Sequence, residues 1–219
     1  MTSIHTLDLI GVFAFAIYGA RRAIMAKFDL FGVLLCAALT AVGGGTIREA
    51  ILHGTPAYLH DYSYGIAIVV GVFCAIAIHD YFRKLEKYLL RVDAIGVAVF
   101  AYIGARRADE AGLGLLAMVL FAVLTAVGGG TLTDVITRRK PEALYKDFYP
   151  LAAIVLATGY YLVRPAAREV PVALALIALA FAVRLASLQF KCKLWRPYNG
   201  LRIKLKLPVW RRRLAPEAE

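Results

Sequence analysis

The chain has 219 residues, of which 61% are hydrophobic, and its formal net charge is +11. The apolar residues form blocks of roughly 15–23 residues, the length that crosses a hydrocarbon core of about 30 Å, so the composition argues against a soluble globular domain. The basic residues lie between these blocks. Membrane topology therefore explains the charge, and no nucleic-acid partner is predicted.

Seven membrane spans are predicted in chain order. They cover residues 6–23, 30–52, 65–83, 91–108, 112–137, 149–164 and 170–190. The sixth is the weakest, because Pro150 and Pro165 bracket it and at about 1.5 Å per residue it barely crosses the core. The predicted fold class is an all-α integral membrane protein, with one transmembrane domain over residues 1–190 and a basic cytoplasmic tail over residues 191–219.

The connections between spans differ strongly in basic charge. One side of the membrane collects twenty Lys and Arg residues, including nine in the tail. The other side has only four, Arg106, Arg107, Arg164 and Arg168. Because basic loops stay in the cytoplasm, we expect a multi-pass protein of the inner membrane with its N-terminus outside and its C-terminus in the cytoplasm.

The sequence contains an internal repeat. LTAVGGGT occurs at residues 39–46 and again at 124–131, and at the same offset of 85 residues GARRA at 19–23 matches 104–108, and Glu49 matches Asp134. We infer a duplication, with repeat one at about 5–85, repeat two at about 90–165 and a seventh helix at about 170–190. Three spans per repeat force the copies into opposite orientations. Inverted repeats of this kind recur in transporters, with the site near the midplane.

Each repeat has three consecutive glycines inside a span. They are Gly43, Gly44 and Gly45 in the second span and Gly128, Gly129 and Gly130 in the fifth. Glycine weakens a helix interior, so these runs are expected to kink or unwind both helices, and the freed carbonyls would suit a cation. The alternative is that the glycines only allow helices to approach closely.

Polar residues near the glycines are the next candidates for an ion pathway. Arg48 and Glu49 follow the first run and Asp134 follows the second, and intramembrane charges are functional candidates, although structural pairing is an equal alternative. Thr40 and Thr125 precede the runs and would either offer hydroxyls to an ion or bond back to their own helix.

Three further charges have simpler interpretations. Asp8 and Asp93 stand at the predicted starts of spans one and four and are interpreted as helix N-caps. Arg184 lies in the seventh span and is expected to reach the cytoplasmic interface.

Motifs of enzymes and metal sites are missing from the sequence. It has no Walker A loop, HExxH, GxSxG or paired-cysteine motif. No enzymatic activity, cofactor or metal site is predicted.

The paired GGGT motifs, each followed by an acidic residue and then a proline, resemble the prokaryotic trimeric intracellular cation (TRIC) channels, a domain also labelled a glycine transporter domain. The resemblance covers about residues 5–190. It implies a homotrimer with one pore per protomer, lined by kinked second and fifth helices and permeable to K⁺ and Na⁺, with K⁺ preferred. By motif it implies that the glycine runs line the pore, with Arg48, Glu49 and Asp134 close by. Family members often carry Arg-Asp after the glycines, whereas this chain has Arg48-Glu49 and Thr133-Asp134, so a symmetric arginine gate is not implied.

Three hypotheses follow. The leading one is a monovalent cation channel, with K⁺ or Na⁺ as the permeant ion and membrane lipid as a partner that could also be bound. The alternative is an ion-coupled secondary transporter of a small zwitterion such as glycine, with half-helix N-termini holding the carboxylate. The third is a lipid-binding or assembly protein without transport.

Overall fold

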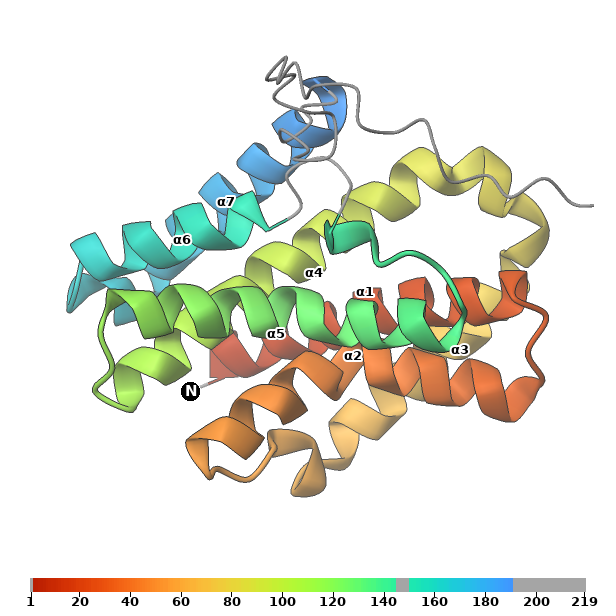
Figure 1. The fold of residues 1–219 in the computed structure, drawn as a ribbon, viewed down its shortest axis with the longest axis horizontal. Coiled ribbons are helices and arrows are strands. Elements are labelled where there is room, and N and C mark those ends of the chain that lie inside the picture. The colour runs from red at the N-terminus through yellow and green to blue at the C-terminus, as the bar shows by residue number, and fades with distance from the viewer. Residues whose placement is uncertain (1, 145–149, 191–219) are drawn as a thin grey trace, which may run out of the picture.

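The structure is a computed structural model that describes residues 2–144 and 150–190, and within those residues its helices form an all-α bundle (Figure 1). The predicted basic tail over 191–219 lies outside the described residues. The seven α-helices of the described part are α1 (Thr2–Met25), α2 (Leu30–Leu52), α3 (Tyr62–Ala77), α4 (Phe82–Glu110), α5 (Leu115–Ile136), α6 (Leu151–Leu162) and α7 (Val170–Phe190). Short 3₁₀ helices are η1 (Ala57–Leu59), η2 (His79–Tyr81), η3 (Glu142–Leu144) and η4 (Ala166–Arg168).

The helices match the seven predicted spans, with one clear difference in length. α3 ends at Ala77 and α4 already begins at Phe82, so the basic segment before the fourth span is helical. Leu, Lys, Glu and Arg dominate that segment and are all good helix formers. α6 has 12 residues, or about 18 Å of rise, so the prediction of a short sixth helix is confirmed.

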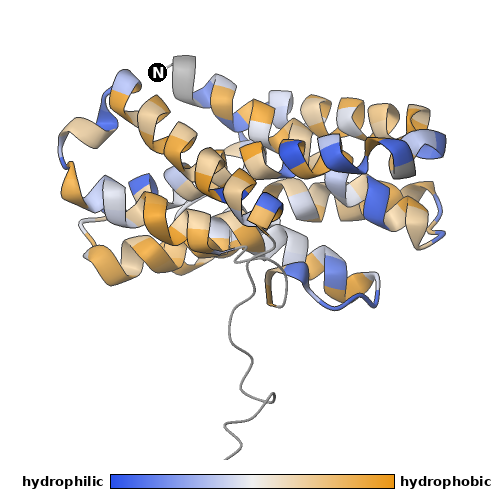
Figure 2. Ribbon diagram, turned by 90° about the horizontal axis from the view of Figure 1, so that it is seen from above, coloured by the Kyte–Doolittle hydropathy of each residue, from blue (hydrophilic) through white to orange (hydrophobic). Residues whose placement is uncertain are grey.

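The surface is that of a multi-pass membrane protein. α2, residues 84–110 of α4, α5 and α7 are each long and apolar enough to cross a bilayer. Apolar residues cover most of the helical ribbon (Figure 2). Large side chains such as Phe31, Phe73 and Leu116 are 73%, 66% and 85% exposed, which lipid tails accommodate and water does not.

The backbone repeats as the sequence does. α1–α3 form repeat one and α4–α6 form repeat two, in inverted orientation because each contains three helices. Left-handed backbone occurs at Lys27 and His53 in the first copy and at Gly112 and Arg138 in the second. Each pair is separated by the same offset of 85 residues, so the turns after matching helices are conformational copies.

The glycine runs do not unwind their helices. α2 and α5 are helical throughout and lie side by side in opposite directions (Figure 1). A Cβ at Gly44 would lie 2.3 Å from the Thr125 carbonyl oxygen, and one at Gly129 would lie 2.4 Å from that of Thr40. The expected unwinding is therefore wrong, and close approach, the alternative interpretation, is what the structure shows. An unwound segment would free backbone groups that lipid cannot satisfy, whereas two intact helices in contact gain packing.

Two other expectations are corrected. Asp8 and Asp93 lie inside α1 and α4, because both helices begin earlier than predicted, so neither is an N-cap. Arg184 does not reach the interface. Its side chain is 2% exposed and its Nη2 atom lies 3.7 Å from Oδ2 of Asp93, which is 1% exposed. A buried charge needs a partner of opposite sign, and α4 and α7 supply one to each other.

Candidate functional site

The contact between α2 and α5 carries threonine hydroxyls on both helices. The Thr40 hydroxyl donates to the Cys36 carbonyl at 2.8 Å, and the Thr125 hydroxyl donates to the Phe121 carbonyl at 2.7 Å. Both threonines thus bond back to their own helix, one of the two predicted roles. Thr40 Oγ1 also lies 2.7 Å from Thr133 Oγ1 of the facing helix, so the helices are joined by a direct hydroxyl contact.

A pocket opens at the end of α2, and we name it the Glu49 pocket. Its cavity volume is about 40 Å³, enough for about three water molecules. It is lined by Asp8, Val12, Ala41, Val42, Gly45, Arg48, Glu49, Pro56, Ala57, Tyr58, Tyr64, Phe100, Ile103 and Thr125. At its rim the Tyr64 hydroxyl donates to the Asp8 carboxylate.

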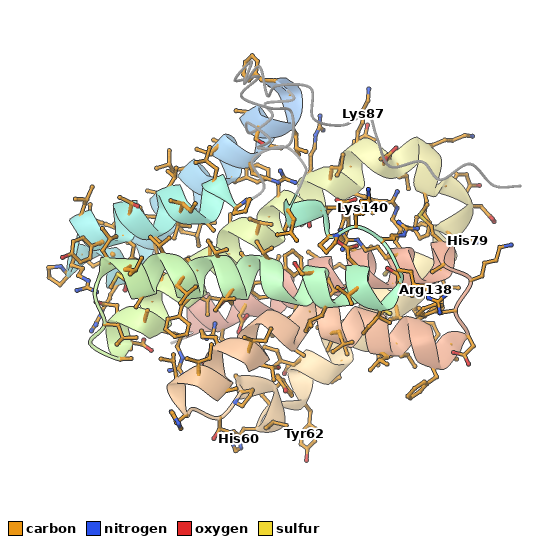
Figure 3. All side chains as sticks on the ribbon, in the orientation of Figure 1. His60, Tyr62, His79, Lys87, Arg138 and Lys140 are labelled. Carbon is orange, nitrogen blue, oxygen red and sulfur yellow. The ribbon has the colours of Figure 1, made fainter. Side chains whose placement is uncertain are left out.

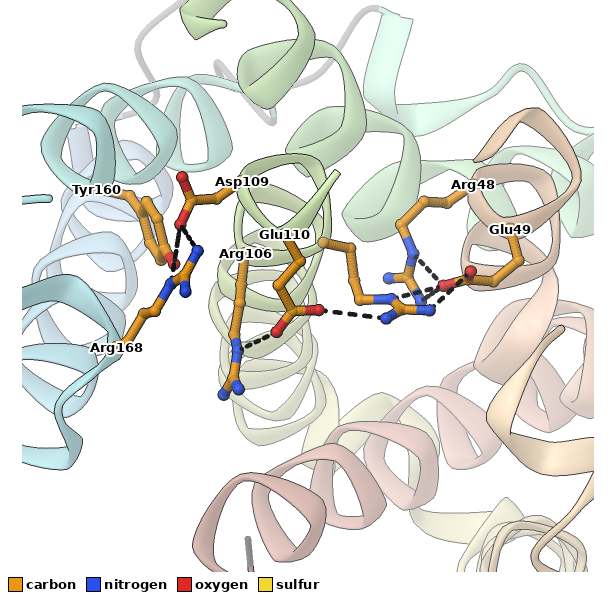
Figure 4. Close-up of polar contacts among 8 residues, drawn as sticks. Arg48, Glu49, Arg106, Asp109, Glu110, Tyr160 and Arg168 are labelled. Atoms are coloured by element: carbon orange, nitrogen blue, oxygen red, sulfur yellow. Dashed lines mark hydrogen bonds and ion pairs between the residues drawn. The ribbon is translucent and has the colours of Figure 1, made fainter. Parts of the chain in front are cut away.

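Two arginines share one carboxylate in the Glu49 pocket (Figure 4). Arg48 donates from Nε and Nη2 to Glu49 Oε1 at 3.0 and 2.8 Å. Arg107 donates from Nη2 to Glu49 Oε2 at 2.9 Å and from Nε to Oε1 at 3.0 Å. Arg48 Nη1 also reaches the Thr125 hydroxyl at 3.4 Å, which places its guanidinium at the contact between the two helices.

A second pocket opens at the end of α5, and we name it the Asp134 pocket. Its cavity volume is about 10 Å³, and it is lined by Arg22, Val127, Gly130, Thr131, Asp134, Glu142 and Ala143. Arg22 lies between two carboxylates, with Nη1 2.7 Å from Asp134 Oδ1 and Nη2 3.4 Å from Glu142 Oε2. The Tyr18 hydroxyl donates to the same Glu142 oxygen at 3.0 Å.

The two pockets are copies of one another. Five lining residues of the Asp134 pocket have their counterparts, 85 residues earlier, in the lining of the Glu49 pocket: Val127 with Val42, Gly130 with Gly45, Asp134 with Glu49, Glu142 with Ala57 and Ala143 with Tyr58. One pocket therefore lies towards each end of the α2–α5 pair, with the glycine and threonine contacts between them.

The arginines that hold the two acids are exchanged between the repeats. Arg107 of repeat two binds Glu49 of repeat one, and Arg22 of repeat one binds Asp134 of repeat two. Sequence reasoning matched GARRA to GARRA and Glu49 to Asp134 but did not connect them. The signal was present, because inverted copies bring a residue near one end of its own repeat to the matching end of the other.

The predicted site residues fall into three groups. Gly45, Arg48, Glu49 and Thr125 line the Glu49 pocket. Gly130 and Asp134 line the Asp134 pocket. Thr40, Gly43, Gly44, Gly128 and Gly129 form the contact between α2 and α5. The sequence did not single out Arg22, Arg107, Tyr18 or Glu142.

The four arginines on the side with few basic residues are all ion-paired. Arg107 binds Glu49, as described, and Arg106 lies 2.8 Å from Glu110. Arg164 and Arg168 each lie 2.7 Å from Asp109, and Figure 4 shows the second of these pairs. On the opposite side, Figure 3 shows Lys87, Arg138 and Lys140 far from His60, which follows the end of α2. Pairing sharpens the charge difference between the two sides.

The loop before α3 is fixed by Asp61. Its side chain caps α3 by accepting from the Ser63 N–H at 2.8 Å, and it lies 2.6 Å from Nε2 of His5 in α1. These hydrogen bonds favour the ionised carboxylate, so they lower the pKa of Asp61 below its ordinary value of 3.8.

This arrangement defines a polytopic membrane protein built from two inverted repeats that share buried charges. A family model described as glycine transporter matches residues 5–80 and again 90–165, one match for each repeat. The chain belongs to this family.

Curated relatives are uncharacterised membrane proteins. The UPF0126 membrane protein of Deinococcus radiodurans is 41% identical over 165 residues, which cover 74% of this chain and 77% of the relative. The UPF0126 inner membrane protein YadS of Escherichia coli K12 is 40% identical over 164 residues, covering 72% and 79%.

Solved structures with the same fold are cation channels. The TRIC orthologue from Rhodobacter sphaeroides is similar with a TM-score of 0.77 and 33% identity, covering 88% of this chain and all of the other, 100%. A structure from work on conductance through TRIC cation channels is similar with a TM-score of 0.80 and 30% identity, covering 90% and 97%. These similarities confirm the resemblance and the fold class inferred from the sequence.

Proposed function

We propose that the protein is a monovalent cation channel whose pathway runs between α2 and α5, from the Glu49 pocket to the Asp134 pocket. The observation that carries the proposal is the pair of matching pockets at opposite ends of the two helices. Both are lined by buried charged groups, which are costly in a membrane and mark ion pathways there. The fold shared with TRIC cation channels supports it.

The narrowest part of this pathway is the contact between the pockets. There Gly44 lies against the Thr125 backbone, Gly129 lies against that of Thr40, and the hydroxyls of Thr40 and Thr133 are 2.7 Å apart. Conduction requires α2 and α5 to separate or tilt at this point, where glycine backbones and threonine hydroxyls can replace part of the water around an ion.

The remaining features of the proposal come from topology and resemblance. The Glu49 pocket faces outwards and the Asp134 pocket faces the cytoplasm, since the basic connections stay inside. K⁺ permeates better than Na⁺, each protomer of a homotrimer has its own pathway, and lipid fills the apolar surfaces between and around protomers.

A second candidate function is ion-coupled transport of a small zwitterion such as glycine, which the name of the family suggests. One observation favours it. The Glu49 pocket is lined by Asp8 and Arg48, so a carboxylate and a guanidinium are available in one cavity to an ammonium and a carboxylate of a ligand.

The experiment that tests the proposal is ion flux into liposomes carrying the purified protein. K⁺, Na⁺, an impermeant organic cation and glycine are offered in turn. Fast, non-saturating K⁺ flux without any added solute supports the channel. Absence of cation flux together with saturable glycine uptake driven by an ion gradient would replace it by the transporter.

Pocket-filling variants locate the pathway. Gly45→Leu and Gly130→Leu place a side chain in each pocket without striking facing backbone, because the atoms nearest to an added Cβ are the Arg48 and Arg22 side chains at 3.8 and 3.6 Å. Both should reduce K⁺ flux to that of empty liposomes. Gly65→Leu is the matched control, since a Cβ there meets nothing within 4 Å. Normal flux in both pocket variants would exclude this pathway.

A further inference from the structure

The two pockets match in position but differ in charge, and the difference arises at two pairs of counterpart residues. Glu142 in the Asp134 pocket corresponds to Ala57 in the Glu49 pocket. Arg48, beside the Glu49 pocket's own acid, corresponds to Thr133 of α5. Each exchange makes the Asp134 pocket more negative than its copy by one charge.

The Asp134 pocket holds one guanidinium between two carboxylates. Arg22 contacts both Asp134 and Glu142, so one negative charge is left over in this cluster. The Tyr18 hydroxyl supports Glu142 and corresponds to the apolar Ile103 in the other pocket. The second carboxylate is therefore a built feature of this pocket, held by two side chains of α1.

The Glu49 pocket holds the reverse arrangement. Arg48 and Arg107 share Glu49, so one positive charge is left over in that cluster. The carboxylate of Asp8 also lines the pocket, but it lies at the rim with Tyr64, whereas Arg48 extends to Thr125 at the helix contact. A cation that crosses from one pocket to the other passes this guanidinium.

We propose that the channel rectifies, passing cations more readily from the Asp134 pocket to the Glu49 pocket than in the reverse direction, with Glu142 and Arg48 as the residues that set the asymmetry. This inference rests on the proposed function. Negative charge in a narrow cavity with low-dielectric walls raises the local concentration of cations, and positive charge lowers it. Cation supply is thus enhanced on one side and reduced on the other.

The test is single-channel recording in planar bilayers with symmetric 0.1 M KCl. The quantity measured is the ratio of currents at equal voltages of opposite sign, which we expect to be about two at this modest screening. Single channels insert in both orientations and give mirror-image records. The substitution Tyr58→Cys marks the orientation, because a charged thiol reagent reaches the introduced thiol only from the chamber that the Glu49 pocket faces.

Each variant converts one residue to its counterpart in the other repeat. Arg48→Thr and Glu142→Ala should each lower the current ratio, and the double variant should bring it close to one. Arg106→Thr and Glu86→Ala remove the same charges outside the two pockets and should leave the ratio unchanged. Raising KCl to 1 M should lower the ratio in the unmodified protein, which tests the inference even if a variant fails to assemble.

The outcomes separate this inference from the channel proposal. K⁺ current with a ratio of one at 0.1 M KCl, or a ratio that ignores both pocket substitutions and salt, would overturn the rectification while leaving the channel intact. A larger current entering from the Glu49 pocket would overturn it as well. No K⁺ current at all would overturn the channel itself.

Discussion

The Glu49 and Asp134 pockets have one ancestry in sequence and two distinct electrostatic designs. The first surrounds a carboxylate with two guanidiniums, one of them 41% exposed at the side chain, and the second buries a guanidinium between two carboxylates. Their glycine contacts, by contrast, are nearly identical. Duplication thus preserved the packing of the helices, where a backbone contact leaves no freedom, while the charges around it diverged.

The largest effect should come from removing the arginine of the Asp134 pocket. Arg22→Met leaves Asp134, which is 2% exposed, without its guanidinium and should lower the free energy of unfolding by about 3–5 kcal/mol. Arg107→Met should cost only about 1 kcal/mol, because its side chain is partly exposed and Arg48 still holds Glu49. Unfolding in mixed micelles followed by circular dichroism measures both.

The control for this comparison is Arg21→Met. Arg21 lies next to Arg22 in sequence but only reaches Glu86, at 3.9 Å, and the Glu86 side chain is 60% exposed. Equal losses for Arg22→Met and Arg107→Met would show that the two pockets are energetically alike, against the charge difference argued above.

The glycine contacts should behave alike in the two repeats. Gly44→Ala and Gly129→Ala each drive a methyl group into facing backbone, at 2.3 and 2.4 Å, and should destabilise by about 1–3 kcal/mol. Gly65→Ala, with open space around its Cβ, should be neutral or stabilising. Thermal denaturation in detergent compares the three variants, and a stable Gly44→Ala protein would argue against the close approach of α2 and α5.

A smaller difference is expected between the two threonines. Thr40→Val removes the 2.7 Å contact with Thr133 and should cost about 1 kcal/mol. Thr125→Val removes a longer bond, 3.4 Å, from Arg48 and should cost less. Each also loses its bond to its own helix, so that term cancels. The same unfolding measurement decides, and a larger loss at Thr125 would place the stronger link at the Glu49 pocket.

The smallest effect concerns the acidic cap of α3. Because hydrogen bonds lower the folded-state pKa of Asp61 below 3.8, the carboxylate stabilises the fold above that pH and this stabilisation is lost as the pH falls through the lowered value. Asp61→Asn should therefore reduce the fall in Tm between pH 7 and pH 3. Asp80→Asn, at a side chain that is 78% exposed, is the charge-matched control.

Much of the fold was predictable because membrane helices follow simple rules of length and charge. The seven spans, the short α6 and the duplication all followed from the apolar blocks and the constant offset. The unwinding of α2 and α5 was predicted wrongly, since glycine propensity describes an isolated helix and not one whose backbone is covered by another helix. Packing of this kind depends on which faces meet, and the sequence does not state it.

The candidate site was predicted in part for the same reason. Glu49, Asp134 and Arg48 were identified because charges inside apolar spans are conspicuous. Arg22 and Arg107 were assigned only to connecting segments, although their partners are buried acids of the other repeat. Asp93 and Arg184 were interpreted separately, because the α4–α7 contact that joins them has no counterpart in the repeat pattern.

The exchange of arginines between repeats has a consequence for biosynthesis. Repeat one enters the membrane with Arg22 already in place, and its acceptor Asp134 is translated more than a hundred residues later. Glu49 is made beside Arg48 and so has a partner at once, before Arg107 emerges. The first half of the chain is thus left with an unmatched cation until the second half is inserted in the opposite sense. Correct topology of the later helices completes the assembly of the earlier ones, and two separately expressed halves should each be incomplete but complementary.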